Sequence, residues 1–427
     1  MDARVLVATT PGEGHVNPMV PVVREMVQRG HHVHWYTGGA FRDKVERAGA
    51  QYEPMRNAYD FSGRTREESF PSHAGLTGLK GMIAGFKDIF IEPAADQMAD
   101  LLTLIQDFPA DVLVTDETFF GAGFASERTG IPVAWIATSI YVLSSRDTAP
   151  LGLGLPPSSS PLGRLRNAVL KQVSDHVVMR DLRRHADVVR ERVGLPRIPK
   201  GAFENIMRTP DLYLLGTVPS FEYPRGDMPP QVRFVGPFVS PAAADFTPPP
   251  WWSELDSGRP VVHITQGTVA NDAERLLLPA IRALAAEDMF VVATTGVPTA
   301  QLGLCHLPDN VRLESFIPHH ALLPHVDAMV TNGGYGGVNT ALAHGVPLVV
   351  AAATEEKHEV AARVSWSGAG IHLKRRALTE RAIRDAVRTV LDDPRFRVRT
   401  NQLRDEYAER NAVIDAVDLI EGLVTAR

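Results

Sequence analysis

The chain has 427 residues, of which 44% are hydrophobic and 22% are charged, and its formal net charge is −6. A chain of this length exceeds one ordinary core and predicts two domains of roughly 200 residues each. The lysines and arginines are dispersed along the chain, which excludes a nucleic-acid partner. The sequence has neither a signal peptide nor a run of ~18 apolar residues, so it predicts no membrane partner.

The first part of the chain predicts a strand, a loop, a helix and a second strand. Residues 4–10 are a β-rich apolar run, and residues 11–15 form a loop that contains two glycines. Residues 18–29 repeat apolar side chains at helical spacing, with both of their prolines in the first turn, where a missing N–H is tolerated. Residues 32–37 return as a strand. This order is the βαβ signature of a parallel sheet.

Two more buried strands are predicted at residues 111–116 and 131–136, with a helix at residues 119–130 between them. The Pro-, Ser- and Gly-rich residues 152–163 predict a loop or lid. Insertions of that kind on a doubly wound sheet usually shape a substrate pocket.

The same order of predicted elements recurs after Pro260, with a strand (residues 261–265), a loop (266–269), a helix (275–286) and a strand (290–295). The fold class is therefore α/β, with two Rossmann-like parallel sheets facing across a cleft.

The expected domain organisation follows from the proline-rich segment between the two halves. Residues 1–240 form the first domain, residues 241–257 a semi-rigid linker, and residues 258–394 the second domain. Residues 395–427 predict one charged amphipathic helix that packs at the domain junction.

The most specific signal is an ordered set of motifs in the second half. Residues 315–319 (Ser-Phe-Ile-Pro-His) precede a strand at 328–331, a glycine-rich turn at 332–339 and a helix at 340–344. A glycine-rich turn between strand and helix directs backbone N–H groups and the positive helix end toward an anion such as a diphosphate. The alternative is a tight turn without a ligand.

This set of motifs, together with the Gly-His pair near the N-terminus, resembles the inverting glycosyltransferases that act on natural products and xenobiotics. These enzymes have the two-Rossmann GT-B architecture and include macrolide and plant secondary-product (UDP-glycosyltransferase-like) members. The resemblance implies transfer of a hexose from a UDP- or dTDP-sugar to a hydroxyl of a natural product, polyketide or phenolic acceptor. It implies inversion at the anomeric carbon, no metal ion or other cofactor, and a monomer or homodimer.

The resemblance also assigns a donor site. Phe316 would stack on the nucleotide base, His319 would meet the base edge, and Thr340 stands where many relatives have a glutamate that binds the ribose hydroxyls. Because threonine is not a bidentate carboxylate, UDP and dTDP both stay open. The other donor contacts implied are Gly14, Gly267, Thr268, Asn332, Gly333, Gly334, Gly336, Gly337, Glu356 and Lys357.

His15 is the candidate base. It follows a predicted strand at the edge of the sheet where open α/β folds place ligands, and imidazole is suited to removing a hydroxyl proton near neutral pH. The resemblance places Asp116 behind it, where a carboxylate fixes the imidazole tautomer. The alternative for His15 is a surface or capping role. Acceptor-pocket candidates are Phe86, Phe90, Trp135 and Tyr141, each of which is equally explained as core.

Other functions are less compatible with the sequence. Asn17 replaces the third glycine of a dinucleotide fingerprint, no phosphate-loop motif occurs, and the paired histidines lack metal-ligand spacing. A nucleotide-sugar epimerase, an envelope-precursor transferase, a non-catalytic GT-B auxiliary protein, and transfer to nitrogen or carbon remain open. The single cysteine, Cys305, excludes an internal disulfide and is typical of a reducing compartment, so we expect a cytoplasmic protein.

Overall fold

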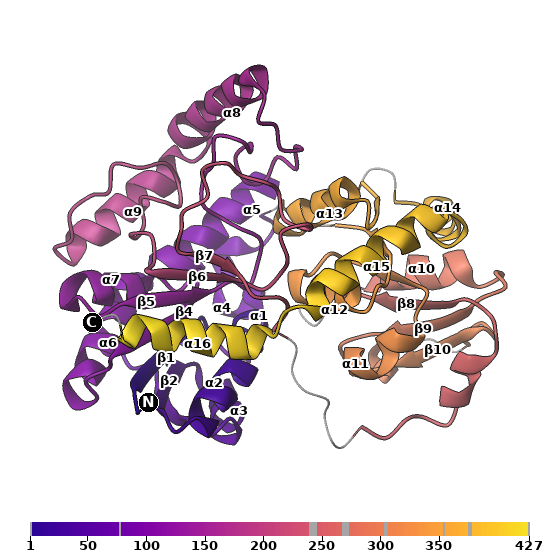
Figure 1. Ribbon diagram of the computed structural model, residues 1–427, viewed down its shortest axis with the longest axis horizontal. Helices are drawn as coiled ribbons and strands as arrows, with labels where there is room; N and C mark the ends of the chain where they lie inside the picture. The colour runs from indigo at the N-terminus through magenta and orange to yellow at the C-terminus, as the bar shows by residue number, and fades with distance from the viewer. Residues whose placement is uncertain are drawn as a thin grey trace.

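The computed structural model has two α/β halves, each built on one parallel sheet with helices on both faces (Figure 1). The structure describes residues 2–76, 78–238, 246–266, 273–302, 306–352, 355–374 and 378–425. No helix within these ranges is both long and apolar enough to cross a bilayer. Because both faces of a parallel sheet are covered, its strands read as continuous apolar runs instead of alternating ones.

Sheet A lies in the N-terminal half and has the strand order β3-β2-β1-β4-β5-β6-β7. Its strands are β1 (Arg4–Ala8), β2 (His32–Thr37), β3 (Gln51–Pro54), β4 (Val112–Asp116), β5 (Val133–Ile136), β6 (Leu212–Leu215) and β7 (Val232–Phe234). Its helices are α1 (Glu13–Val16), α2 (Met19–Gln28), α3 (Arg42–Arg47), α4 (Arg66–Ser69), α5 (Gly78–Gly85), α6 (Ala94–Asp107), α7 (Phe120–Thr129), α8 (Pro161–Val173) and α9 (Arg180–Arg192), with π-helical segments η3 (Phe86–Ile91) and η4 (Ser174–Val178). The order reverses between β1 and β4, and open α/β sheets bind ligands at the carboxyl ends of such strands.

Sheet B lies in the C-terminal half and has the strand order β10-β9-β8-β11-β12-β13. Its strands are β8 (Val261–Thr265), β9 (Phe290–Thr294), β10 (Val311–Glu314), β11 (Ala328–Thr331), β12 (Leu348–Val350) and β13 (Gly370–His372). Its helices are α10 (Leu277–Leu284), α11 (His319–Leu322), α12 (Tyr335–Ala343), α13 (Glu355–Ser367) and α14 (Glu380–Asp392). Here the reversal falls between β8 and β11, so the turn after β11 also lies at a ligand-binding edge.

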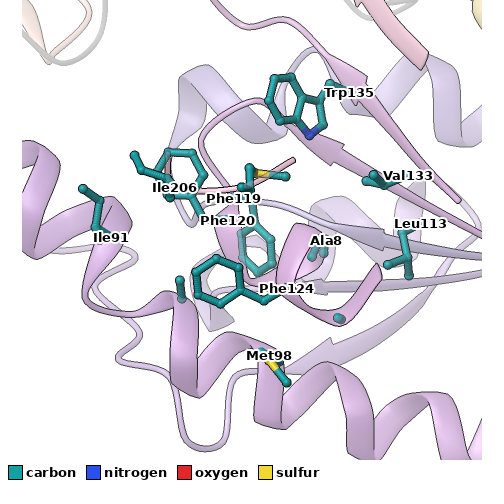
Figure 2. Close-up of a cluster of buried hydrophobic side chains, with 14 of the residues drawn as sticks. Ala8, Ile91, Met98, Leu113, Phe119, Phe120, Phe124, Val133, Trp135 and Ile206 are labelled. Carbon is teal, nitrogen blue, oxygen red and sulfur yellow. The ribbon is translucent and has the colours of Figure 1, made fainter. Parts of the chain in front are cut away.

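Apolar side chains pack on both faces of each sheet. Figure 2 shows the cluster that joins sheet A to its helices, with Phe119 and Phe124, both fully buried, at its centre. Trp135 is 3% exposed and packs edge-on against Tyr213 in the same cluster. Burying an apolar side chain of this size contributes about 1.5–3 kcal/mol, and Trp135 is thus placed as a core residue.

Several predicted elements match the structure closely, since the predicted strands 32–37, 261–265 and 328–331 are β2, β8 and β11. The prediction of a helix over 340–344 is wrong at its start, because α12 begins at Tyr335 inside the glycine-rich turn. Gly334 is its extended N-cap, and within the turn Gly333 takes a positive φ of 88°. Glycine is permitted in both conformations, so the sequence alone could not show where the turn gives way to the helix.

The predicted single helix at 395–427 is also wrong, because the segment forms two helices, α15 (Pro394–Ala408) and α16 (Ala412–Thr425). In Figure 1, α15 lies along the C-terminal half and α16 crosses to the N-terminal half. There Glu421 accepts hydrogen bonds from Arg29 Nη1 at 3.0 Å and pairs with His31 Nε2 at 2.8 Å. The tail therefore packs on both halves, through α15 on α12 and through α16 on α2.

The predicted loop at 152–163 ends earlier than expected. Ser160 Oγ accepts a hydrogen bond from the Gly163 N–H, and Pro161 occupies the first helical position, so α8 begins there. This is the usual combination of a serine N-cap followed by proline.

Candidate active site

His15 and Asp116 meet at the point where the strand order of sheet A reverses. His15 lies on the short helix α1 after β1, and Asp116 is the last residue of β4, the strand beside β1. His15 Nδ1 is 3.1 Å from Asp116 Oδ1. The Asp116 side chain is fully buried, whereas the His15 side chain is 22% exposed. With a carboxylate at Nδ1, the ring proton is held there and Nε2 is the basic nitrogen.

Four groups besides His15 hold the Asp116 carboxylate, one of which is the Thr10 hydroxyl, which donates to Oδ1 at 3.3 Å. The Thr10 N–H donates to Oδ2 at 2.8 Å, and Thr118 donates to Oδ1 through its N–H at 3.0 Å and its hydroxyl at 2.5 Å. Burial alone would raise the pKa of Asp116, but the attraction of His15 and these hydrogen bonds outweigh it, so the pKa is lowered. Asp116 is therefore a fixed anion behind the imidazole.

Aromatic rings extend from His15 along one side of the site. The Phe90 ring centroid is 5.9 Å from that of His15, Phe86 is 5.4 Å from Phe90, and Phe203 is 4.8 Å from Phe86. The structure thus brings two of the four predicted acceptor residues to His15.

Beyond Phe203 is a cavity between the two halves. Its lining includes Tyr141, Leu151, Leu155, Phe203, Tyr223, Arg225, Glu359 and Arg363. Tyr141 therefore lines the cavity, although it is 2% exposed and belongs to the same buried core cluster as Trp135.

The glycine-rich turn after β11 leads directly into α12. A Cβ on Gly333 would lie 2.9 Å from Val350 Cγ1 and 3.2 Å from the Lys357 carbonyl oxygen, so this turn requires glycine. A Cβ on Gly336 would meet no atom within 4 Å, and one on Gly337 would be 3.6 Å from His319 Cε1. The first turn of α12 therefore presents backbone N–H groups from an open surface, which suits a diphosphate.

The other predicted donor residues occupy varied positions. Phe316 is 70% exposed, and Asn332 is buried, with its amide donating to the Gln266 carbonyl. The Thr340 hydroxyl donates to the Gly336 carbonyl at 2.8 Å. Burial lowers the pKa of His319 to about 4, so this imidazole is neutral.

Three donor predictions cannot be compared with atoms. Gly267 and Thr268 lie outside the described residues. Glu356 is within α13, but its side chain lies outside the described part of the structure. By contrast, Gly14 is in α1, where a Cβ would meet no atom within 4 Å.

Residues 277–423 match the family described as erythromycin biosynthesis protein CIII-like, C-terminal domain. The chain is 84% identical over 424 residues to the 4'-demethylrebeccamycin synthase of Lentzea aerocolonigenes, and the match covers 99% of this chain and 100% of that protein. UDP-glycosyltransferase 2 of Phaeomoniella chlamydospora is 33% identical over 439 residues, covering 99% of this chain and 96% of that protein. The chain belongs to the GT-B glycosyltransferases of natural-product biosynthesis.

Solved structures agree on the fold of the transferase. The glycotransferase of kitacinnamycin superposes with a TM-score of 0.78 at 23% identity and covers 99% of this chain and 100% of its own. Glycosyltransferase VinC, solved with dTDP, superposes with a TM-score of 0.71 at 22% identity, covering 99% and 100%. The family resemblance and the GT-B fold predicted from the sequence are confirmed.

Glu117 is a residue of the transferase site that the sequence analysis missed. It follows Asp116, is 3% exposed, and accepts hydrogen bonds from the Thr138 N–H at 2.8 Å and the Thr138 hydroxyl at 3.1 Å. Burial and the neighbouring Asp116 raise the pKa of Glu117 to about 7. The available signal was two consecutive carboxyl residues at the end of a predicted buried strand.

The substitution Glu117→Gln is expected to flatten the pH dependence of stability. The folded pKa of Glu117 is above its ordinary value of 4.5, so the protonated carboxyl stabilises the fold at low pH and this contribution is lost as pH rises through 7. Between about pH 5.5 and pH 8, the free energy of unfolding of the wild type should fall by about 2 kcal/mol more than that of the variant. Urea unfolding at both pH values measures this difference. The pKa of Asp116 is lowered, so Asp116 changes the pH dependence of stability only below pH 3.8, outside the range compared here. An equal fall in the free energy of unfolding in both proteins would show that Glu117 does not titrate near pH 7 in the folded state.

Proposed function

We propose that the transferase moves a hexose from a UDP- or dTDP-sugar to a small-molecule acceptor in one displacement with inversion at the anomeric carbon. The observation that carries this proposal is the pair formed by partly exposed His15 and buried Asp116 at the ligand edge of sheet A. An accessible imidazole with an anion behind it is suited to general base catalysis, because the anion fixes the tautomer and stabilises the imidazolium.

In the proposed step, the acceptor hydroxyl gives its proton to His15 Nε2 while its oxygen bonds to the anomeric carbon. The bond from that carbon to the nucleoside diphosphate breaks, and the electron pair leaves with the diphosphate. Asp116 stabilises the imidazolium that forms. An α-linked donor would give a β-linked product.

The diphosphate is proposed to leave against the first turn of α12, where the open face at Gly336 admits an anion to the backbone N–H groups. Charge that develops on the leaving oxygen would be stabilised there without a metal ion. The close packing of Gly333 on Lys357 fixes this turn against α13. Phe316, exposed before α11, is available to stack on the base.

The acceptor is proposed from the relative that is 84% identical, which is named for synthesis of 4'-demethylrebeccamycin. We propose that this transferase forms the same product by glycosylating its sugar-free precursor. The rings of Phe86 and Phe90, in line with His15, support an acceptor with an extended apolar surface.

The proposal predicts that the purified protein binds UDP or dTDP in the presence of EDTA. Calorimetric titration with each nucleotide measures the affinity and the preference, because Thr340 offers no carboxylate for a ribose 2'-hydroxyl. Retained binding in EDTA supports a site built from backbone N–H groups. Failure to bind either nucleotide, with or without added Mg²⁺, would overturn the donor site. Binding that appears only with Mg²⁺ would overturn metal independence alone.

A further inference from the structure

A loop of the N-terminal half is fastened to helix α13 of the C-terminal half. Glu359 Oε1 accepts hydrogen bonds from the backbone N–H groups of Gly152 and Gly154, both at 2.8 Å. Both glycines have positive φ values, 95° and 57°, which other residues rarely adopt. A Cβ on Gly154 would lie 2.8 Å from the His358 ring, so the loop lies directly on the helix. In Figure 1, α13 stands at the junction of the two halves.

Buried charges hold Glu359 in place. Its Oε2 accepts a hydrogen bond from Arg363 Nη1 at 3.1 Å, and Arg363 Nε donates to Glu222 of the N-terminal half at 2.8 Å. These three side chains are 6%, 2% and 1% exposed, and the Arg363 guanidinium also lies 4.1 Å from the Tyr223 ring centroid. An interaction this well buried is only weakly screened by solvent, unlike a surface ion pair.

The fastened loop forms one wall of the cavity between the halves. Leu151 and Leu155 of this loop line it together with Tyr141 and Phe203. From Phe203 the aromatic rings continue to His15. A chain of ring contacts therefore links the lining of the cavity to the candidate base.

Helix α13 also contacts the proposed donor site. Lys357, two residues before Glu359, packs its backbone against Gly333 of the glycine-rich turn. One helix thus contacts the turn proposed for the diphosphate and the loop over the cavity.

We propose that Glu359 is a positioning residue for the acceptor: it holds residues 148–155 over the acceptor cavity from the donor-binding half. This inference rests on the function proposed above. The fastened loop has two consequences, a preformed wall for the acceptor and a barrier to bulk water. If the loop is released, water can replace the acceptor, bonding to the anomeric carbon as the bond to the diphosphate breaks and one proton is released.

The test uses Glu359→Ala and, from the other side of the contact, Gly154→Ala in the full-length protein. Glu359→Ala removes two charge-assisted hydrogen bonds, and the Cβ of Gly154→Ala would displace the loop from the His358 ring. Both variants are therefore expected to raise the acceptor KM about tenfold or more. The donor KM should stay within about twofold, and hydrolysis of the nucleotide sugar per transfer event should rise several-fold. Glu359→Gln should recover much of the acceptor KM, because its amide oxygen can accept from both glycines.

The matched control is Glu380→Ala, which removes an exposed glutamate of α14 that pairs with Arg282 at 2.7 Å. It should leave both KM values and hydrolysis unchanged. If Glu359→Ala does not fold, Gly154→Ala decides alone. An unchanged acceptor KM, or an equal rise in donor and acceptor KM, would overturn the inference. A wild-type protein that neither binds nucleotide nor transfers sugar would instead overturn the proposed function.

Discussion

Replacing His15 by alanine is expected to lower kcat/KM for sugar transfer by about 10³-fold, within the 10²–10⁴ range typical of a general base. The imidazole is the accessible member of the pair, and the Asp116 carboxylate behind it is buried. Nucleotide affinity should change less than about twofold, because the proposed diphosphate site is in the other half. Initial rates with saturating donor, together with calorimetry on the same preparation, separate the two effects.

The matched control is His34→Ala. His34 also pairs its Nδ1 with a carboxylate, Glu53, at 2.8 Å, but it lies inside strand β2, whereas His15 is on α1 at the ligand edge of sheet A. Its loss should leave the transfer rate close to wild type. A His15→Ala protein that transfers sugar at the wild-type rate would show that another group removes the proton.

The pairing of His15 with Asp116 was predicted from the family resemblance, and the strands explain why the two residues meet. β1 and β4 are parallel neighbours with Val5 opposite Val112, so their carboxyl ends meet at one edge. The sequence had to show only that both segments are strands of one parallel sheet. Short apolar runs separated by helices indicate such a sheet well.

Positions set by tertiary packing were less predictable. Trp135 and Tyr141 are both large aromatics near the end of β5 and both belong to the same buried core cluster, yet Tyr141 also lines the cavity. Strand alternation separates faces, but both faces of sheet A are covered by helices, so alternation does not separate core from site.

The contact between Glu359 and the loop at Gly152 has no local signal at all. Its partners are 207 residues apart, and the contact depends on how the two halves pack. A glutamate on an otherwise polar helix segment reads as a solvated side chain, and a glycine-rich loop reads as unrestrained. Neither the helix sequence nor the loop sequence indicates a hydrogen bond between the two domains.

The break between α15 and α16 has a similar origin. The residues from 395 onward are rich in helix-forming side chains, and propensity alone continues the helix. The chain instead turns between Ala408 and Ala412, so that α16 packs its apolar face on the N-terminal half. The stabilisation from burying that face outweighs the few helical hydrogen bonds that are lost where the chain turns.

The substitution Asp116→Asn is expected to lower kcat by about 10²–10⁴-fold with little change in size at the site. An amide presents N–H donors where the carboxylate accepted from His15 Nδ1 at 3.1 Å, and so favours the tautomer with its proton on Nε2, which cannot act as base. The acid limb of the pH–rate profile should move to lower pH, because the imidazolium loses its anionic neighbour. The profile from about pH 5 to pH 9 measures both effects.

The control for that change is Thr118→Val, which removes the hydroxyl that donates to Asp116 Oδ1 at 2.5 Å but keeps the carboxylate. Its effect on kcat should stay within about tenfold, since Thr10 and the Thr118 N–H still hold the anion. If instead Asp116→Asn keeps both the rate and the acid limb of wild type, then Asp116 is a structural residue of β4. In that case the charge that stabilises the imidazolium must come from another group, and Glu117, the next residue along the chain, would be the first to replace.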